Sequence, residues 1–571
     1  MSEILFQYQK VNPTTWVYLS SLLMIGLYFK FSRFWSVRNL DLVLLILLAP
    51  GLLTAQYGVE VRIRAARLAA LNTQGAAESR TPAAEPGTAK RSRGDSGAGE
   101  WGAGKSDSLI PPGEKAVSAF PEPLSGRPFA EAPAAGVERG QRLAMGNDDG
   151  GENDGENDGE NDGENDSDQP ASEAGSRVPL QQAVEASIGI ERLGFLWLFA
   201  IGSIWLVRLL LDPTMVRRPL LEPNLTTGGL VFIGVSLFVF LMANVWASQR
   251  FRTDGPSGVA AIRDLAAADG ERIPPGLAAD TIRRGPGYAL LNLVPTIPTM
   301  PLVAEGMPAT PQQRTRAIVA KSIAVLCHLA VVLGIVAIGY WHFGNTKTGV
   351  GVATLYLMLP YTAQMTGHID HVIPAALLVW AVLCYRRPLT AGMLIGLATG
   401  LVYYPLFLLP LWVSFYWRRG LMRFTAGVVV TLAVMALSLV FIPHASYWEN
   451  LKQMFGLWLP LQDGLQGIWG LGWEPVYRIP VLAAFFALSF TFAIWPPQKN
   501  LGTLLSCSAS VMVATQFWHG YGGGLYIGWY LPLTLLTVFR PNLEDRVALA
   551  VLGEGWSRWR SPGLANGFKA A

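Results

Sequence analysis

The chain alternates between long apolar runs and short segments of polar and basic residues. A helix needs about 17 to 25 apolar residues to cross the hydrocarbon core of a bilayer, which is about 30 Å thick. Runs close to this length lie at residues 15–31, 40–57, 193–211, 228–247, 317–341, 350–366, 372–385, 389–416, 421–442, 477–495, 501–518 and 525–539. The pattern predicts an all-α fold, a polytopic transmembrane helical bundle with about 11–13 membrane segments.

Basic residues beside the apolar runs predict which ends face the cytoplasm, because flanking Lys and Arg stay on that side of the membrane. The run at 389–416 starts and ends beside pairs of arginines. As a single crossing it would leave one pair outside. We therefore expect two short helices, 389–402 and 405–416, that meet at a break containing Tyr403 and Tyr404. Broken backbone at membrane depth needs surrounding protein or a water-filled cavity, so we expect this break to point into a cavity.

One long segment, residues 60–188, is rich in Gly, Ala, Pro, Ser and charged residues and nearly lacks aromatics. It has too little apolar surface to offset the entropy of ordering, so we expect it to be disordered and, by the charge rule, outside. Residues 151–166 repeat Gly-Glu-Asn-Asp four times, with a spacing that favours a solvated acidic linker over a specific calcium site.

The expected parts of the chain are an N-terminal two-span membrane segment (1–59), the low-complexity acidic linker (60–188), a multi-span membrane domain (189–545) with outer loops 248–316 and 443–476, and a cytoplasmic tail (546–571).

Composition supports a membrane protein, because 51% of the 571 residues are hydrophobic and only 15% are charged. The net charge is +3, and the basic residues cluster beside apolar runs instead of lining one polar face. No nucleic-acid partner is therefore expected. The three cysteines lie in separate apolar runs, which excludes a disulfide framework or a cysteine-based metal site. We expect a multi-pass protein of the cell membrane (plasma or inner membrane), in contact with membrane lipid.

Polar chemistry is expected on the outer side of the bundle. From residue 228 to 539 every Asp and Glu falls in a loop or at the boundary of an apolar run. This argues against an ion-coupled transporter, which usually keeps an ionisable group near the membrane midplane. Four of the six histidines, His368, His371, His444 and His519, are instead expected outside. That distribution suits chemistry on a lipid-linked substrate.

The sequence His368-Ile369-Asp370-His371 offers imidazole and carboxylate ligands within four residues. Three interpretations stay open: a divalent cation site that bridges a donor phosphate, direct contact with substrate or phosphate, or a helix N-terminal cap by Asp370 with interfacial histidines. On a helix His368 and His371 share a face and Asp370 does not, so one ion bound by all three requires a loop. His519, followed by a Gly-Tyr-Gly sequence, either lines the same cavity or forms a plain turn.

The region 365–420 resembles the GT-C superfamily of polyprenyl-phosphate-sugar-dependent glycosyltransferases, in its mannosyl- and arabinofuranosyltransferase-like branch. The resemblance rests on the polar cluster after Gly367, a basic turn, an Ala-Gly-x-x-x-Gly helix and a return helix rich in proline, carried by Gly367 to Asp370, Arg386, Arg387, Ala391, Gly392, Gly396, Pro405 and Pro410. Small residues at four-residue spacing are also common in helix packing. The branch tends to carry Lys before the proline, where this chain has Tyr403 and Tyr404.

The resemblance implies transfer of a sugar, such as a hexosyl or mannosyl group, from a polyprenyl-phosphate carrier with inversion. It implies an acidic general base in the first large outer loop, for which Asp254 is the first candidate and Asp264 the second. Asp254 also fits a simple loop turn before Gly255 and Pro256. Without the lysine, donor phosphate must be bound by other outer residues or by a metal. The arginine candidates are Arg250, Arg252, Arg283 and Arg284.

Two classes of function remain at this point. The first is a membrane-embedded glycosyltransferase whose substrate-binding residues include His368, Asp370, His371, Tyr403, Tyr404, Arg250, Arg252 and His519. The second is a non-catalytic scaffold or envelope-assembly component with envelope protein partners, which the missing lysine favours. No motif requires a cofactor. The histidine cluster is the only sequence feature that suggests a bound divalent cation.

Overall fold

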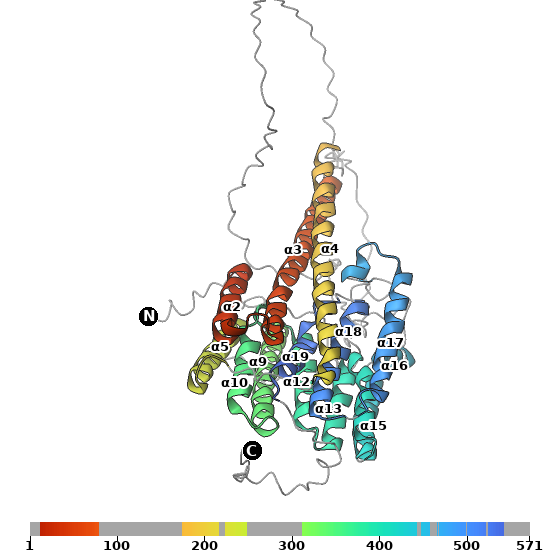
Figure 1. Cartoon of the computed structure of the whole chain (residues 1–571). Helices are drawn as coiled ribbons and strands as arrows, with labels where there is room; N and C mark the ends of the chain where they lie inside the picture. Colours follow the sequence, from red (N-terminus) through yellow and green to blue (C-terminus); the bar gives the residue numbers. More distant parts are fainter. Residues whose placement is uncertain are drawn as a thin grey trace, which may run out of the picture. The chain divides into compact units, whose positions relative to one another are not determined.

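The computed structural model describes residues 12–78, 174–215, 223–247, 311–418, 420–441, 447–456, 465, 467–497, 499–520 and 523–541. Within these ranges every regular element is a helix and no strand occurs (Figure 1). Among them, residues 12–61 and those from Ser187 onward belong to one compact unit, and residues 62–78 and 174–186 belong to a second. The packing described below lies within the first unit. The chain is an all-α polytopic membrane protein, as its hydropathy pattern predicts.

The expected apolar runs coincide with helices. The longer ones are α2 (Pro13–Tyr28), α3 (Val37–Glu78), α4 (Ala174–Leu211), α5 (Thr227–Ala247), α9 (Pro311–Trp341), α10 (Thr346–Met358), α12 (Ile369–Leu383), α13 (Pro388–Leu401), α15 (Leu421–Ser438), α17 (Arg478–Ile494) and α18 (Leu501–Trp518). Shorter α-helices are α11 (Pro360–Gln364), α14 (Leu409–Tyr416), α16 (Tyr447–Met454) and α19 (Leu531–Phe539). Turns of 3-10 helix are η1 (Phe31–Arg33), η2 (Asp212–Thr214), η5 (Tyr404–Leu408), η6 (Leu439–Phe441), η7 (Gly467–Gly470), η8 (Pro475–Tyr477) and η9 (Ile527–Trp529).

Six helices in the described ranges are long and apolar enough to cross a membrane, and further apolar helices of 10–17 residues accompany them. Several expected spans are shorter because prolines interrupt them. The run expected at 350–366 divides between α10 and α11, where Leu359 adopts an extended backbone before Pro360. A residue that precedes proline avoids the helical region, so the helix ends there.

The limits of the expected linker need correction. Helix α3 continues to Glu78 and α4 begins at Ala174, so both ends of the segment expected at 60–188 are helical. Residues after Val61 are rich in Ala, Arg and Leu, which have high intrinsic helix propensity even where no apolar core is available. The acidic repeats lie outside the described residues.

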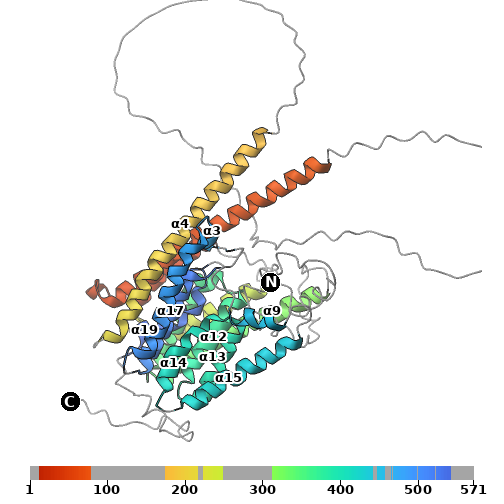
Figure 2. The same cartoon turned by 90° about the vertical axis from the view of Figure 1, so that its right-hand side faces the viewer.

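The run at 389–416 forms two helices, as its flanking charges predict. Helix α13 ends at Leu401, and η5 with α14 returns to Tyr416, whose hydroxyl donates to the carbonyl oxygen of Tyr385 at 2.5 Å. Because Tyr385 lies three residues before Pro388, where α13 begins, both ends of the pair lie on one side of the bundle. The pair packs beside α12 and α15 (Figure 2).

The expectation that the break opens into a cavity is wrong. Tyr403 and Tyr404 are 7% and 1% exposed, and other side chains cover them. Irregular backbone at membrane depth is tolerated here because protein encloses it, and not because it faces a water-filled cavity.

The Ala-Gly-x-x-x-Gly sequence of α13 has a packing role. A Cβ on Gly392 would overlap the carbonyl oxygen of Phe424 in α15, and one on Gly396 would lie 3.0 Å from the carbonyl oxygen of Val428. Gly427 of α15 approaches the backbone of α13 in the same way. Small residues therefore let the two backbones touch, which is how helices associate closely in membranes.

A buried group of ion pairs ties the early helices to the end of the bundle. The guanidinium of Arg208 in α4 donates to both carboxylate oxygens of Asp41 in α3, at 2.8 and 2.9 Å. It also contacts Asp212, whose second oxygen accepts from Arg540 at 2.8 Å. Asp212 is 0% exposed. Helices α3, α4 and α19 are thus joined through Arg208 and the two carboxylates of Asp41 and Asp212, at the side predicted to be cytoplasmic.

Candidate functional site

The candidate site lies where several helix ends meet on the side predicted to be outer. Helix α12 begins there, the break between α13 and η5 reaches it, and α18 ends there at Trp518. The short helices α11 and η9 complete the site. Helix η9 contacts α12 and also α11, and so places α11 beside the start of α12. Helix termini leave backbone groups unpaired and turn the chain, so side chains of different elements can converge at such a place.

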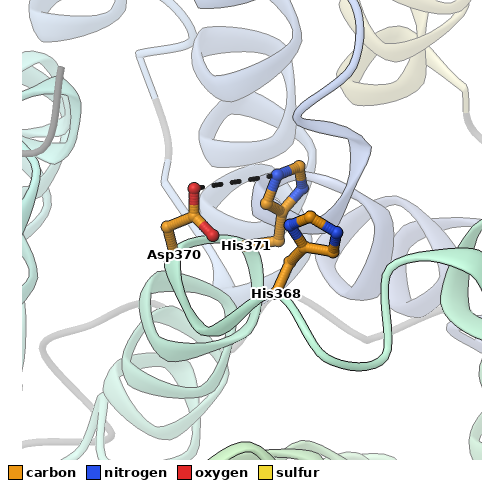
Figure 3. Close-up of side chains that lie close together, drawn as sticks. All are labelled: His368, Asp370 and His371. Carbon is orange, nitrogen blue, oxygen red and sulfur yellow. Dashed lines mark ion pairs between the residues drawn. The ribbon is translucent and has the colours of Figure 1, made fainter. Parts of the chain in front are cut away.

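The His368–His371 sequence forms a compact cluster. Helix α12 starts at Ile369, so His368 precedes it, with φ −89° and ψ 95°. The ligating atoms of His368, Asp370 and His371 all lie within 4.8 Å of one another (Figure 3). Convergence of all three requires a non-helical residue, and His368 supplies it. Asp370 is not the N-terminal cap, because it lies within the first turn, and the cap residue His368 makes no side-chain capping bond.

Neighbouring aromatic residues hold His371. Its Nδ1 lies 2.5 Å from the hydroxyl of Tyr361 in α11. Its ring stacks on that of Tyr526, with centroids 4.4 Å apart and an interplanar angle of 18°. The indole N–H of Trp529 donates to the backbone carbonyl of Asp370 at 3.0 Å. These contacts leave the Nε2 edge of His371 directed toward Asp370, 3.9 Å from its Oδ2 (Figure 3).

A second group of rings surrounds the helix break. The hydroxyl of Tyr403 donates to that of Tyr404 at 2.9 Å. The ring of Tyr404 lies 5.1 Å from Trp518 and 4.8 Å from His519, measured between centroids. Arg478, the first residue of α17, is 1% exposed and donates through Nε to the carbonyl oxygen of Trp518 at 2.7 Å. The buried guanidinium of Arg478 therefore lies near the tyrosines of the break.

Tyr526 joins the two groups. Its ring stacks on His371 and lies 4.6 Å from His519, which in turn contacts Tyr404. His519 is 1% exposed, so it packs into the cluster and is not part of an exposed turn. Gln516 fixes the position of this segment, because its side-chain oxygen accepts from the backbone N–H of Tyr526 at 3.2 Å. The histidine cluster and the helix break are therefore parts of one site.

Two polar groups in this part of the fold are buried without a hydrogen-bond partner. They are the indole Nε1 of Trp518 and both amide atoms of Gln364, the last residue of α11. Buried polar groups are nearly always paired in native proteins, and exceptions mark strain, function or a bound molecule. A polar ligand in the site would supply such partners.

A small apolar cleft borders the same site. It lies between α3, α11, η9 and α19 and is lined by Leu45, Leu48, Ala49, Leu52, Leu359, Pro360, Tyr361, Ile527 and Leu531. Tyr361 belongs both to this lining and to the histidine cluster, through its bond to His371. Tyr361 therefore lies between the cleft and the histidine cluster.

The expected site residues fall into two groups. His368, Asp370, His371, Tyr403, Tyr404 and His519 come together in the structure, through the contacts given above. Asp254, Asp264, Arg250 and Arg252 lie outside the described residues, as do Arg283 and Arg284.

Sequence reasoning missed Tyr361, Tyr526 and Arg478. A signal for Arg478 existed: it is a basic residue at the outer end of an apolar run, where the charge rule predicts none. The two tyrosines carried no comparable signal, because interfacial aromatics are common in membrane proteins.

Comparison with known proteins gives one finding. Residues 306–518, which are less than half of the chain, match the profile of glycosyltransferase family 87. The region 365–420, which resembles polytopic glycosyltransferases in its motifs, lies inside this match. No curated protein and no solved structure matches the chain at a significant level. The matched part includes the histidine cluster, the helix break and Trp518, and it is similar to a family of glycosyltransferases.

Proposed function

We propose that the protein is a glycosyltransferase of the cell membrane that moves a sugar from a polyprenyl-phosphate carrier to an acceptor hydroxyl on the extracytoplasmic side. The observation that carries the proposal is the convergence of the His368 cluster and the Tyr403 break beside an apolar cleft, within a region similar to glycosyltransferase family 87. A substrate that joins a long apolar chain to a charged phosphate and a polar sugar matches a site of this composition.

The cleft and the cluster suit the two ends of such a donor. An apolar lining keeps a polyprenyl chain out of water, and the chain loses no hydrophobic free energy when it moves from lipid to such a lining. Tyr361 lies at the boundary, with its ring in the cleft lining and its hydroxyl on His371. A chain bound in the cleft brings the phosphate to His368, Asp370 and His371.

The sugar is then expected among the aromatic rings near the break. Aromatic side chains stack on the apolar faces of sugar rings and bind hydroxyl groups through their polar atoms. Trp518, with its unpartnered indole N–H, and Tyr404 supply this combination once the side chains that cover them move, because the two residues are 0% and 1% exposed. Arg478 adds a buried positive charge at the same position, suited to a developing phosphate charge.

The reaction requires one bond to form and one to break. The acceptor oxygen attacks the anomeric carbon and forms the new glycosidic bond. The bond from that carbon to the phosphate oxygen breaks, and polyprenyl phosphate leaves with the bonding electrons. A general base takes the proton of the acceptor hydroxyl. We propose Asp254 for this base, with Asp264 as second candidate, and Arg250 and Arg252 as additional phosphate-binding residues.

The test is transfer by purified full-length protein in lipid nanodiscs. Labelled polyprenyl-phosphate sugars and candidate acceptors are supplied, and labelled product is measured. We expect transfer by the wild type, and strong loss in Asp254→Ala and in Tyr404→Leu. Glu474→Gln, which changes an exposed carboxylate, is the matched control and keeps full activity. No transfer by the wild type with any donor, or full transfer in both Asp254→Ala and Asp370→Ala, contradicts the proposal.

The alternative is a non-catalytic scaffold in envelope assembly, favoured by the tyrosines that stand where related sequences tend to carry lysine. Under this alternative the purified protein transfers no sugar and a partner protein co-purifies with it in stable proportion. Deletion of residues 75–180 then shows whether the acidic linker holds that partner.

A further inference from the structure

The side chains of His368, Asp370 and His371 provide two imidazoles and one carboxylate within a small volume. Their ligating atoms lie within 4.8 Å of one another, and they form the candidate metal-binding group of the described residues. Two histidines with one carboxylate are a donor set that binds first-row divalent transition metals and leaves coordination positions open. Two of the three residues, Asp370 and His371, are buried, which shields the group from bulk water.

The distances suit an ion with little rearrangement. Nε2 of His371 and Oδ2 of Asp370 are 3.9 Å apart, longer than a hydrogen bond. Atoms bound to one ion at about 2.0–2.2 Å are separated from each other by about 3–4 Å. The widest separation in the group, 4.8 Å, must therefore shorten by about 1 Å. His368 can provide this movement, because it is only half-buried and precedes the helix.

Neighbouring side chains hold His371 and Asp370 in place, as is usual for residues that bind a metal ion. Histidines that bind metals usually hydrogen-bond through the other ring nitrogen, which fixes the ring orientation. Tyr361 contacts Nδ1 of His371, and Tyr526 stacks on the ring. With the proton on Nδ1 donated to the phenol oxygen, Nε2 is the ring nitrogen on the side of Asp370. Trp529 holds the backbone of Asp370.

We infer that His368, Asp370 and His371 bind a divalent transition-metal ion, Mn²⁺ or Zn²⁺, whose open positions take the phosphate of the lipid-linked donor. The phosphate part of this inference rests on the proposed function, and the metal site stands without it. The ion supplies the positive charge that a lysine before Pro405 would otherwise provide, where this chain has tyrosines. A metal on the phosphate stabilises the leaving group as the glycosidic bond to it breaks.

The test measures Mn²⁺ binding directly on the full-length protein, by titration and by pulsed electron paramagnetic resonance. The Gly-Glu-Asn-Asp repeats carry many carboxylates and attract cations, so millimolar Ca²⁺ is included to occupy them. Coupling of Mn²⁺ to imidazole nitrogen then distinguishes the histidine site from the repeats. We expect one nitrogen-coupled Mn²⁺ per chain, displaced by Zn²⁺.

Variants decide which residues bind the ion. His368→Gln and Asp370→Asn each lower the Mn²⁺ affinity about tenfold or more, and circular dichroism and gel filtration verify that they fold. Glu474→Gln, an exposed carboxylate outside the cluster, binds Mn²⁺ like the wild type. Absence of nitrogen-coupled Mn²⁺ in the wild type, or wild-type affinity in both His368→Gln and Asp370→Asn, overturns the metal site.

Activity after chelation separates this inference from the proposed function. If the wild type transfers sugar fully after chelation and binds no Mn²⁺, the metal site is wrong and glycosyl transfer stands. If it binds Mn²⁺ as expected but transfers no sugar, the metal site stands and the proposed function is wrong.

Discussion

The hydroxyl of Tyr361 lies 2.5 Å from Nδ1 of His371, and this contact joins the apolar cleft to the polar cluster. Tyr361 comes from α11, a helix of five residues that exists because Leu359 and Pro360 interrupt the apolar run. Without the interruption the tyrosine would continue along α10. A local break in one membrane segment therefore fixes the orientation of a histidine in the next.

Replacing Tyr361 by Phe should weaken the cluster without changing the cleft. The ring stays in the cleft lining, and only the hydroxyl on His371 is lost. Partners of this kind typically contribute about 10–100-fold to metal affinity or activity. We expect a decrease of this size in Mn²⁺ affinity by titration and in transfer rate by the labelled-donor assay.

Tyr356→Phe is the matched control for that experiment. Tyr356 is also buried, and its hydroxyl lies 3.1 Å from Nδ1 of a different histidine, His328. His328 contacts the backbone of Thr366 and does not belong to the cluster. If both variants lose Mn²⁺ affinity equally, the role of Tyr361 is general stability and not orientation of His371.

Filling the apolar cleft should impair long-chain donors selectively. Leu48 lines the cleft and is 5% exposed, so Leu48→Trp places a larger side chain where the polyprenyl chain is proposed to bind. We expect KM for a long-chain donor to rise at least tenfold, with little change for a short-chain analogue that does not occupy the cleft. Steady-state kinetics with both donors give the comparison.

Leu22→Trp controls for the added bulk. Leu22 belongs to α2, is 69% exposed and does not line the cleft. Equal increases in KM for the two donor lengths in Leu48→Trp place the polyprenyl chain elsewhere.

Much of the fold follows from sequence because membrane crossing imposes length and charge constraints that one sequence displays. The paired helices of 389–416 were predictable, since a single crossing would put arginines on the wrong side. The continuation of α3 to Glu78 was not, because it depends on local helix propensity and not on apolar burial. The hydropathy pattern indicates which segments must be buried. It does not indicate where a helix continues past the end of a buried segment.

The site was predictable in part for a related reason. His368, Asp370 and His371 are neighbours in sequence, so their type and spacing were visible, but their convergence depended on where α12 begins. Tyr526 comes from a distant segment, and only tertiary packing brings it onto His371. Arg478 was overlooked although its position contradicts the charge rule.

The carboxylate of Asp212 should contribute strongly to stability. It is 0% exposed and accepts from both Arg208 and Arg540. Asp212→Asn leaves the buried charge of Arg540 uncompensated, whereas Arg208 keeps Asp41. Loss of one partner of a buried ion pair costs about 3–5 kcal/mol. We expect a clearly lower midpoint of thermal unfolding in detergent, with Glu474→Gln unchanged. A midpoint equal to that of the wild type means that the ion pairs do not hold α3, α4 and α19 together.

Gly392 should tolerate no side chain, because α13 and α15 touch at their backbones. In Gly392→Ala the added Cβ overlaps the carbonyl oxygen of Phe424, which cannot move without shifting α15. Forcing extra volume into a packed interface costs about 1–3 kcal/mol. Gly26→Ala in α2 is the control, since nothing lies within 4 Å of its added Cβ and alanine favours a helix. We expect thermal unfolding of Gly392→Ala at a lower temperature, and of Gly26→Ala at an equal or higher one. Equal unfolding of Gly392→Ala and the wild type contradicts direct backbone contact, and the Ala-Gly-x-x-x-Gly sequence then needs a role other than packing.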